Sequence, residues 1–448
     1  MRIMIVGAGL VGYHLCEKLS GEGHEVVLVD RDEKKLRRLG RKLNILTVHG
    51  SGASAKTLEE AGIDRTDLFI AVTDSDEVNL VACIMSKQYD VKKRIARVRN
   101  EDFLSPGTPL NEKALGIDLL ISPDLAMTDE ILKLTTVSEA FDVAEFAHGQ
   151  LVLLGYGVHN DNPCAGLSLL QIKEQKGSYR FVVVAVIRDG VTIVPRGEDR
   201  IETGDKIYIM VRSQDISAVE DLFNLISVKA HRVFIIGGGN IGYQVARRME
   251  ADNIEVRLVE RDPDRCEFLT ENLEHTVVLN CDGLEAHHLV EEAIDQADLV
   301  ISVTHSDTTN ILSSILAKHH GAKKCITKIN RPDFIPLVGK LGIDVALSPR
   351  QVAANMILGF VRRGTIISVA TLLDSDAEII EVKVPDESHF IDEPLKSISF
   401  PIGAVVGAIV RNDQVFIPSG ETTLQLGDNL VIFLTPDARQ AVELFFEL

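Results

Sequence analysis

Basic residues are in short supply in this chain of 448 residues. It contains 47 Lys and Arg against 66 Asp and Glu, which gives a formal net charge of −19 at pH 7. Proteins that bind nucleic acid need a basic surface that neutralises phosphates, and anionic lipids attract the same kind of surface. The composition therefore argues against nucleic acid as a partner and against direct attraction to an anionic bilayer. It leaves contact with the basic loops of a membrane protein open.

Cysteine is scarce too, and its placement excludes two roles. The six cysteines are scattered without any C-x-x-C pair, at Cys16, Cys83, Cys164, Cys266, Cys281 and Cys325. A disulfide framework or a zinc site requires cysteines at regular, paired spacings. The pattern indicates reduced, buried thiols in a cytoplasmic protein.

Long apolar runs are missing as well. A helix that spans a bilayer needs about 20 consecutive apolar residues. The longest stretch without a charged residue covers residues 146–160 and includes His148, Gln150 and Asn160. The first strand-like run begins at Arg2, so we expect no signal peptide and a cytoplasmic location.

Signatures of catalysis do not occur. The sequence has no H-E-x-x-H, G-x-S-x-G or P-loop Gly-Lys-Ser/Thr motif. Tyr89 and Lys93 have the Tyr-x-x-x-Lys spacing of short-chain dehydrogenases, but they lie far too early in the predicted domain, so we interpret the spacing as chance. The adjacent histidines at 287–288 and 319–320 should diverge by about 100° on a helix. We therefore predict no catalytic residue and no metal site.

What the chain does contain is a glycine-rich motif that occurs twice. Residues 7–12 read GAGLVG and residues 237–242 read GGGNIG, each between an apolar run and a helical pattern. This is the G-x-G-x-x-G fingerprint of dinucleotide-binding sites. Its glycines allow a tight turn, close approach of a pyrophosphate, and packing of helix on strand. The anion would rest on the unpaired N–H groups of the helix start.

An acidic residue follows each fingerprint at the expected distance. Asp30 and Glu260 each lie 18 residues after the last glycine of the motif, at the end of a second predicted strand. A carboxylate there accepts hydrogen bonds from the ribose hydroxyls and repels a 2′-phosphate, so NAD(H) or an adenine nucleotide is favoured over NADP(H). Arg31 and Arg261 follow directly and weaken this preference slightly, but we interpret them as solvated charges at a helix start.

Further candidates lie where open parallel sheets bind ligands, at the carboxyl ends of strands. Thr73 and Asp74 follow the fourth predicted strand, and Arg97 ends the fifth. A helix cap would explain the first two equally well, and a surface ion pair would explain Arg97. In the second copy, His305 and Lys328 replace Asp74 and Arg97. The second pocket is therefore expected to differ in nucleotide or charge preference.

The duplication extends over the whole chain. Short apolar strands alternate with helical patterns in residues 1–135 and again in residues 229–362, which predicts β-α-β crossovers and parallel sheets. Each copy is followed by a smaller β-rich segment with a closing helix, at residues 136–228 and 363–448. The predicted fold is α/β, with two Rossmann-like parallel-sheet domains, each followed by a small β-rich α+β domain. Residues 226–231 would link the two halves.

The order of these parts resembles the TrkA family, the NAD-binding regulatory subunits of bacterial Trk potassium uptake systems. The resemblance is carried by the two fingerprints and by VTDSDEVN at 72–79, RIAR at 94–97 and LVER at 258–261. It covers the whole chain and implies tandem RCK (potassium-conductance-regulating) domains, each with a nucleotide-binding N-terminal half (RCK-N) and a C-terminal half (RCK-C). The tandem order is specific, whereas a single RCK unit also occurs in other channel and exchanger regulators.

The resemblance also implies ligands and partners. It implies a protein that is not an enzyme, binds NAD(H), with ATP and ADP as alternatives, and gates a membrane-embedded potassium channel from the cytoplasmic face of the cell membrane. RCK units pair, so a chain with two units would assemble as a homotetrameric gating ring. An NAD-dependent oxidoreductase and a regulator of another RCK-controlled ion transporter are the alternative functions. The residues implied for nucleotide binding are Gly7, Ala8, Gly9, Leu10, Val11, Asp30, Thr73, Asp74 and Arg97 in the first unit, and Gly237, Gly238, Gly239, Asn240, Ile241 and Glu260 in the second.

Overall fold

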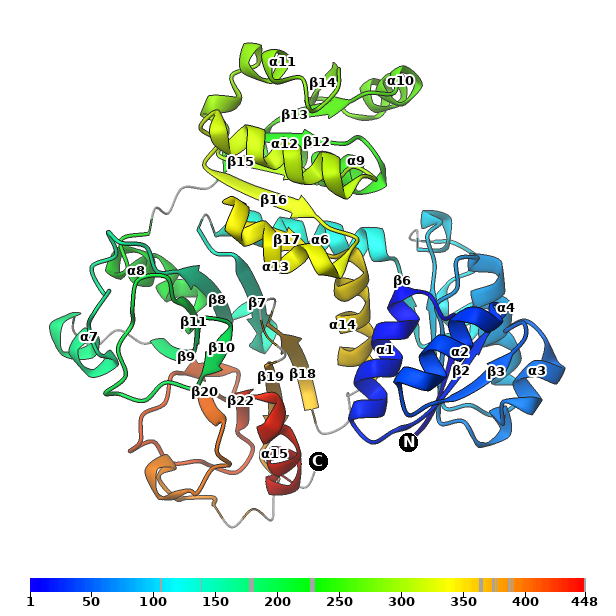
Figure 1. Cartoon of the computed structure of the whole chain (residues 1–448). Coiled ribbons are helices and arrows are strands. Elements are labelled where there is room, and N and C mark those ends of the chain that lie inside the picture. Colours follow the sequence, from blue (N-terminus) through cyan, green and yellow to red (C-terminus); the bar gives the residue numbers. More distant parts are fainter. Residues whose placement is uncertain are drawn as a thin grey trace. The chain divides into compact units, whose positions relative to one another are not determined.

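A computed structural model of the chain (Figure 1) describes all residues except 105–106, 138, 177–180, 226–229, 362–365, 373–374, 376, 386–387, 389 and 447–448. Most of the predicted linker at residues 226–231 lies outside the described residues. The described chain forms two six-stranded and two five-stranded sheets. The predicted α/β class, with two Rossmann-like sheets that are each followed by a β-rich segment, is confirmed. None of the helices described is long and apolar enough to cross a membrane.

The first parallel sheet has the doubly wound strand order β3-β2-β1-β4-β5-β6. Helices cover both of its faces, so inner strands such as β4 are buried along their whole length. Because β1 and β4 pair in parallel although their order in the chain is not consecutive, the ends of these two strands form the switch point where such sheets bind ligands. The strands are β1 (Arg2–Val6), β2 (Glu25–Asp30), β3 (Leu46–His49), β4 (Leu68–Ala71), β5 (Lys93–Arg97) and β6 (Leu119–Ile121). The helices are α1 (Leu10–Gly21), α2 (Glu33–Lys42), α3 (Ala55–Glu60), α4 (Asp76–Lys87), α5 (Glu112–Leu115) and α6 (Pro123–Thr136).

The second parallel sheet repeats the first strand for strand, in the order β14-β13-β12-β15-β16-β17 (Figure 1, green to yellow). Its strands are β12 (Arg232–Ile236), β13 (Glu255–Glu260), β14 (Val277–Asn280), β15 (Leu299–Ser302), β16 (Lys324–Lys328) and β17 (Val345–Leu347). Its helices are α9 (Asn240–Ala251), α10 (Pro263–Asn272), α11 (Ala286–Glu291), α12 (Asp307–His319), α13 (Ile335–Val338) and α14 (Pro349–Val361).

The two antiparallel sheets also share one connectivity, β10-β9-β11-β8-β7 and β21-β20-β22-β19-β18. The first contains β7 (Asp142–Phe146), β8 (Leu151–Gly157), β9 (Phe181–Arg188), β10 (Val191–Ile193) and β11 (Lys206–Arg212), with α7 (Leu169–Lys176) and α8 (Ile216–Leu222). The second contains β18 (Ile366–Thr371), β19 (Glu378–Lys383), β20 (Ala404–Arg411), β21 (Gln414–Phe416) and β22 (Asn429–Leu434), with α15 (Arg439–Phe445).

A repeated ion pair explains the Arg and Gly-Asp positions that the two small segments share. Arg188 donates from Nε and Nη2 to the two oxygens of Asp205 at 2.7 and 2.8 Å, and Arg411 makes the same pair with Asp428. Both carboxylates are buried, so the bidentate guanidinium supplies the hydrogen bonds that burial would otherwise remove. These residues therefore stabilise the small sheets and lie outside the candidate pockets.

The chain divides into two compact units, and each is made of two separate stretches of sequence. Residues 1–130 with 234–358 contain both parallel sheets, and residues 131–233 with 359–448 contain both antiparallel sheets. Because this division follows packing and not sequence order, the four consecutive domain ranges remain a prediction.

Candidate functional site

The first fingerprint forms the turn between β1 and α1. Gly7 has a φ of +115°, and a Cβ there would lie 2.9 Å from the backbone nitrogen of Thr73, so only glycine fits. A Cβ on Gly12 would lie 1.9 Å from the carbonyl oxygen of Gly7, and its absence lets the helix pack against the turn. A Cβ on Gly9, in contrast, would meet nothing within 4 Å. Neighbouring protein atoms thus leave no room for a side chain at Gly7 or Gly12, whereas the space beside Gly9 is free for a ligand.

Helices α1 and α9 begin without a side-chain cap. Their N-cap residues, Gly9 and Gly239, make no side-chain hydrogen bond, whereas Asp32 caps α2 and Ser75 caps α4. The first N–H groups of each 12-residue helix are therefore left for an external acceptor. Together with the positive end of the helix dipole, they suit an anionic group.

The two predicted acids are fixed beside these turns. Oδ2 of Asp30 accepts a hydrogen bond from the N–H of Ala8 at 2.5 Å, and Oδ1 accepts one from the N–H of Asp32 at 2.7 Å. Glu260 accepts the matching bond from Gly238 at 2.8 Å. Because a carboxylate oxygen has two lone pairs, each oxygen can still accept a bond from a sugar hydroxyl. The backbone bonds hold the carboxylate in place for that role.

Thr73 is held by a buried asparagine that the fingerprint does not identify. Oδ1 of Asn79 accepts hydrogen bonds from the N–H and the hydroxyl of Thr73 at 2.9 and 2.7 Å. Its Nδ2 donates to the carbonyls of Thr73 and Arg97 at 3.1 and 2.9 Å. Asn310 makes the same four bonds in the second copy. The sequence signal for this clamp is the spacing Thr-x-Ser-x-x-x-Asn, which occurs at the same place in both copies.

The helix cap after the fourth strand is formed by Ser75, and not by Thr73 or Asp74 as the alternative interpretation required. The hydroxyl of Ser75 accepts a hydrogen bond from the N–H of Val78 at 3.2 Å and caps α4. Asp74 is exposed, with Oδ1 3.6 Å from Nη1 of Arg97. Thr73 and Asp74 nevertheless line the first pocket, so the cap and the pocket use neighbouring residues.

The side chain of Arg97 is more buried than that of an arginine in an ordinary surface ion pair. Its side chain is only 13% exposed, and its Nε has no hydrogen-bond partner among the described residues. Burial, with repulsion from Arg99, lowers the pKa of Arg97, and the charge of Asp74 offsets this in part. A buried cation with an unused donor is stabilised by an anion beside it. Arg97 is thus suited to a phosphate at this edge of the sheet.

The first pocket has a volume of about 240 Å³ and brings together five of the nine residues predicted for it, namely Gly7, Gly9, Asp30, Thr73 and Asp74. Ala8, Leu10, Val11 and Arg97 are not among the residues that line it. Lys35 on α2 and the loop glycines Gly50 and Gly52 after β3 do line it, and the sequence patterns did not single them out.

The second pocket, of about 560 Å³, includes every residue predicted for it except Gly238, namely Gly237, Gly239, Asn240, Ile241 and Glu260. Thr304, His305 and Lys328 line it too. Arg265, the counterpart of Lys35, also lines it, and its Nε donates to the carbonyl of Gly238 at 2.7 Å. The loop Cys281-Asp282-Gly283 completes the wall.

Lys328 is the buried cation of the second pocket. It is 7% exposed, and its Nζ donates to the carbonyl of Val303 at 3.5 Å. Burial lowers the pKa of Lys328, and the charges of Asp124 and Asp307 oppose that shift. Asp124, at the start of α6, itself lines this pocket, with Oδ2 3.5 Å from Nδ2 of Asn240. A carboxylate from the first copy thus contributes to the charge of the second pocket.

One premise about the histidines is wrong. The rings of His287 and His288 do not diverge, because their centroids lie 4.0 Å apart. Those of His319 and His320 lie 5.3 Å apart at 77° to one another.

Tyr89, the candidate excluded as a catalytic residue, donates its hydroxyl to Glu59 at 2.7 Å and lines neither pocket.

Comparisons with known proteins agree with this arrangement. The TrkA-N domain family matches residues 3–123 and 233–349, and the TrkA-C domain family matches residues 154–224 and 379–447. The Trk system potassium uptake protein TrkA of Haemophilus influenzae is 36% identical over 97% of this chain and 96% of its own length. TrkA homolog 2 of Methanosarcina mazei is 34% identical over 100% of both chains.

Solved structures share the fold. The RCK domain of GsuK covers 100% of this chain and 95% of its own, with a TM-score of 0.61 at 20% identity. The GsuK channel bound to NAD also has a TM-score of 0.61 at 20% identity, and the match covers 100% of this chain and 79% of that one. Since the family models match most of the chain and the relatives span it from end to end, the chain belongs to the TrkA family of Trk system potassium uptake proteins.

Proposed function

We propose that this protein is a cytoplasmic, nucleotide-sensing regulatory subunit that gates a membrane potassium uptake channel of a Trk system. The observation that carries the proposal is the pair of matching pockets. Each combines an open glycine, an uncapped helix start and a carboxylate fixed by backbone bonds. The buried Lys328 lines the second pocket, and the buried Arg97 lies beside Asp74 of the first. The names of the relatives, Trk system potassium uptake proteins, support the potassium partner.

NAD(H) fits these groups better than NADP(H) does. In this assignment the ribose hydroxyls donate to Asp30 or Glu260, and the pyrophosphate lies on the N–H groups of α1 or α9. Lys328 supplies positive charge within the second pocket, and Arg97 supplies it from beside Asp74 at the edge of the first. A 2′-phosphate would meet the carboxylate at close range, and Arg31 and Arg261, which also line the pockets, would offset that repulsion only in part. ATP and ADP remain alternative ligands, because they present the same ribose and phosphates.

Sensing requires that the nucleotide binds two conformations of the protein unequally, since a ligand with equal affinity for both shifts nothing. The nonenzymatic role is supported by the names of the relatives, which describe potassium uptake proteins and not enzymes. We propose that the nucleotide acts through changes in the paired Rossmann-like domains. NADH turnover by the purified protein with a small substrate would instead support an oxidoreductase.

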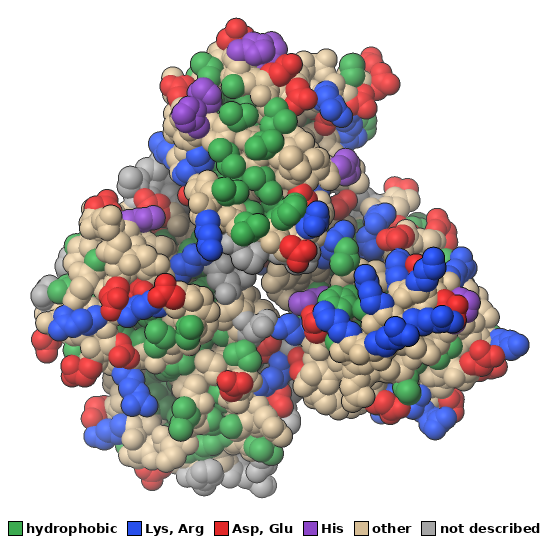
Figure 2. All heavy atoms as spheres, viewed as in Figure 1, with side chains coloured by type: hydrophobic (Ala, Val, Ile, Leu, Met, Phe, Trp, Pro, Cys, Tyr) green, Lys and Arg blue, Asp and Glu red, His purple; other side chains and the backbone are tan. Residues whose placement is uncertain are grey.

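Exposed apolar side chains support assembly into a homotetramer. Val81 and Ile84 on α4 are 43% and 39% exposed, and Leu312 and Leu337 on α12 and α13 are 44% and 52% exposed. Figure 2 shows hydrophobic side chains gathered over α12 and α13. Contiguous apolar surface of this kind marks protein interfaces. Light scattering of the purified chain gives the mass of the assembly directly, and a monomer would remove this part of the proposal.

The test of the function is copurification of the chain with its membrane partner. The proposal expects a potassium channel subunit in the purified complex and NAD(H) or an adenine nucleotide released on denaturation. A different ion transporter in the complex would favour the alternative RCK-controlled system. Recovery of neither a transporter nor a nucleotide would contradict the proposal.

Asp30→Ala should weaken NADH binding to the first pocket by roughly 1–3 kcal/mol, because it removes charge-assisted hydrogen bonds to the ribose. The dissociation constant is measured by calorimetry in a Gly239→Val background, which blocks the second pocket. Asp64→Ala is the matched control, since its exposed carboxylate lies outside both pockets. Unchanged affinity in Asp30→Ala would exclude Asp30 as a ribose ligand.

Nucleotide binding to the second pocket should take up protons. Burial lowers the pKa of Lys328 in the free protein, and a phosphate beside its Nζ would raise that pKa again. The affinity of the second pocket for the nucleotide is therefore highest at pH values below the lowered pKa of Lys328. It falls as the pH rises above that pKa, because the free protein must then bind a proton to hold the nucleotide. Calorimetry in buffers of different ionisation enthalpy measures the uptake in a Gly9→Val background. Lys328→Arg should abolish the uptake, because arginine stays charged; equal uptake in that variant would assign the proton to another group.

A further inference from the structure

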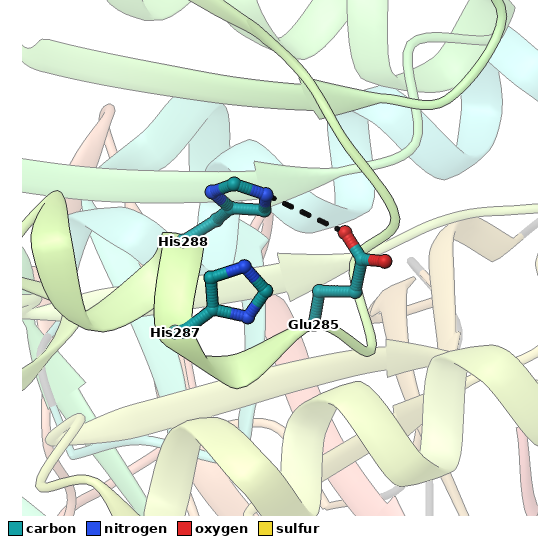
Figure 3. A group of neighbouring side chains, drawn as sticks. All are labelled: Glu285, His287 and His288. Carbon is teal, nitrogen blue, oxygen red and sulfur yellow. Dashed lines mark ion pairs between the residues drawn. The ribbon is translucent and has the colours of Figure 1, made fainter.

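The start of α11 carries a cluster of side chains that the nucleotide pockets do not use (Figure 3). Ligand atoms of Glu285, His287 and His288 all lie within 4.8 Å of one another. Nε2 of His288 lies 3.5 Å from Oε2 of Glu285, and the two imidazole rings lie side by side with centroids 4.0 Å apart. All three side chains reach solvent, and Figure 2 shows histidine side chains at the surface where α11 lies. The group is therefore accessible to an ion.

The orientation of Glu285 explains how its carboxylate comes to lie within this group. Glu285 occupies the N-cap position of α11, yet its side chain makes no capping hydrogen bond. In the first copy, Ser54 at the matching position caps α3 by accepting from the N–H of Thr57. The carboxylate of Glu285 instead turns toward the ring of His288 (Figure 3). The carboxylate of Glu285 is thus not used as a cap and contacts another potential metal ligand.

The ligand set and its spacing select the class of ion. With bonds of about 2.0–2.1 Å, two ligands of a tetrahedral zinc ion lie about 3.3 Å apart, close to the 3.5 Å between His288 and Glu285. Two imidazoles and one carboxylate are ligands that Zn²⁺ accepts readily, whereas Mg²⁺ and Ca²⁺ prefer oxygen ligands alone. Three protein ligands leave the fourth position for water.

A neighbouring carboxylate suits the ring of His288 to this role. Nδ1 of His288 faces Glu291, whose Oε2 lies 3.8 Å away. When the imidazole carries its proton on Nδ1, facing this carboxylate, the lone pair of Nε2 is free for the metal, and carboxylates orient metal-binding histidines in this way in many proteins. Glu291 is thus a positioning residue for His288.

We propose that Glu285, His287 and His288 bind Zn²⁺, and that Glu291 orients His288. The site belongs to the second copy alone, because Ser54, Lys56 and Thr57 occupy the matching positions of the first. The loop that ends at Glu285 also contributes Cys281, Asp282 and Gly283 to the wall of the second pocket. A metal ion held at the start of α11 fastens the end of that loop.

The test uses the full-length protein without a polyhistidine tag, freed of metal with a chelator and then titrated with Zn²⁺ by calorimetry. The wild type should bind one zinc ion per chain at this site. His288→Ala and His287→Ala should each weaken that binding by at least about tenfold, and Glu291→Gln by about tenfold. Circular dichroism confirms that each variant remains folded, which the exposed positions allow.

Two controls make the result specific. The double variant His319→Ala/His320→Ala removes the other adjacent pair, which no carboxylate joins in a metal-ligating group among the described residues, and it should bind zinc as the wild type does. Cys281→Ser should also bind normally. Equal zinc affinity in His288→Ala and the wild type, or loss of the site in Cys281→Ser alone, would overturn the proposal.

Discussion

Gly9→Val is expected to abolish nucleotide binding at the first pocket, by about 100-fold or more in affinity, while the protein stays folded. The backbone of Gly9 is extended, with φ −72° and ψ −171°, so a β-branched residue adopts it without strain. A Cβ at this position meets no protein atom within 4 Å. The side chain would instead occupy the space above the start of α1, where the pyrophosphate is proposed to lie. Gly239→Val has the same effect at the second pocket, where the nearest atom to a Cβ is Nε2 of His305 at 4.0 Å.

Calorimetry with NADH and with ATP measures the loss, and the thermal midpoint of each variant checks the fold. Gly21→Val is the matched control, since Gly21 ends the same helix and a Cβ there also meets nothing within 4 Å. It should change neither affinity nor stability appreciably. Normal binding by a folded Gly9→Val protein would show that the nucleotide does not approach this turn.

The physiological consequence follows if the two pockets are sensors. In cells without other potassium uptake routes, each single variant should alter growth at low potassium, and the double variant Gly9→Val/Gly239→Val should alter it more. The single effects are expected to differ, because His305 and Lys328 replace Asp74 and Arg97 in the second copy. Full potassium-dependent growth of the double variant, with binding confirmed lost, would leave the sensor hypothesis without support.

The fold could be predicted from the sequence because its main determinants are local. Runs of four apolar residues before each fingerprint form the buried strands β1 and β12, and the repeated β-α-β pattern indicates the parallel sheets, whose strand order the structure shows. The acids at the ends of β2 and β13 lie at the turns as expected from their spacing alone. The different roles of the three glycines, however, depend on atoms distant in sequence. A side chain at position 7 would clash with the backbone of Thr73, and these two residues become neighbours only in the folded sheet.

The residues that sequence patterns missed act through such distant contacts. Lys35 and Arg265 enter the pockets from the second helix of each copy, and Asp124 enters the second pocket from α6. Lys35 and Arg265 each lie 28 residues after the first glycine of their motif, but no known pattern marks that position as part of a pocket, and Asp124 has no such spacing from the second motif. The His287–His288 pair was misjudged for another reason. The 100° rule gives the directions of Cβ atoms on a regular helix, whereas long side chains at an irregular helix start can turn toward one another.

Asn79→Asp is expected to have the largest effect on stability of any isosteric change at the site, about 2–4 kcal/mol. Asn79 is fully buried, and its Nδ2 donates to the carbonyls of Thr73 and Arg97. Aspartate would place an oxygen against those two carbonyl oxygens, so two donated bonds are lost and a negative charge is buried. The ends of β4 and β5 would separate, and with them Thr73 and Arg97. Nucleotide affinity at the first pocket should therefore fall together with stability.

Thermal unfolding and calorimetry with NADH measure the two effects on one preparation. Asn100→Asp is the matched control, because Oδ1 of Asn100 only accepts a bond, from the N–H of Asp102, at an exposed site. Aspartate can accept that bond as well, so this variant should behave as the wild type. Asn310→Asp should reproduce the loss of stability and affect the second pocket instead, since Asn310 makes the same four bonds there. If Asn79→Asp left both the thermal midpoint and the NADH affinity unchanged, the clamp between β4 and β5 would have no part in holding the first pocket in shape.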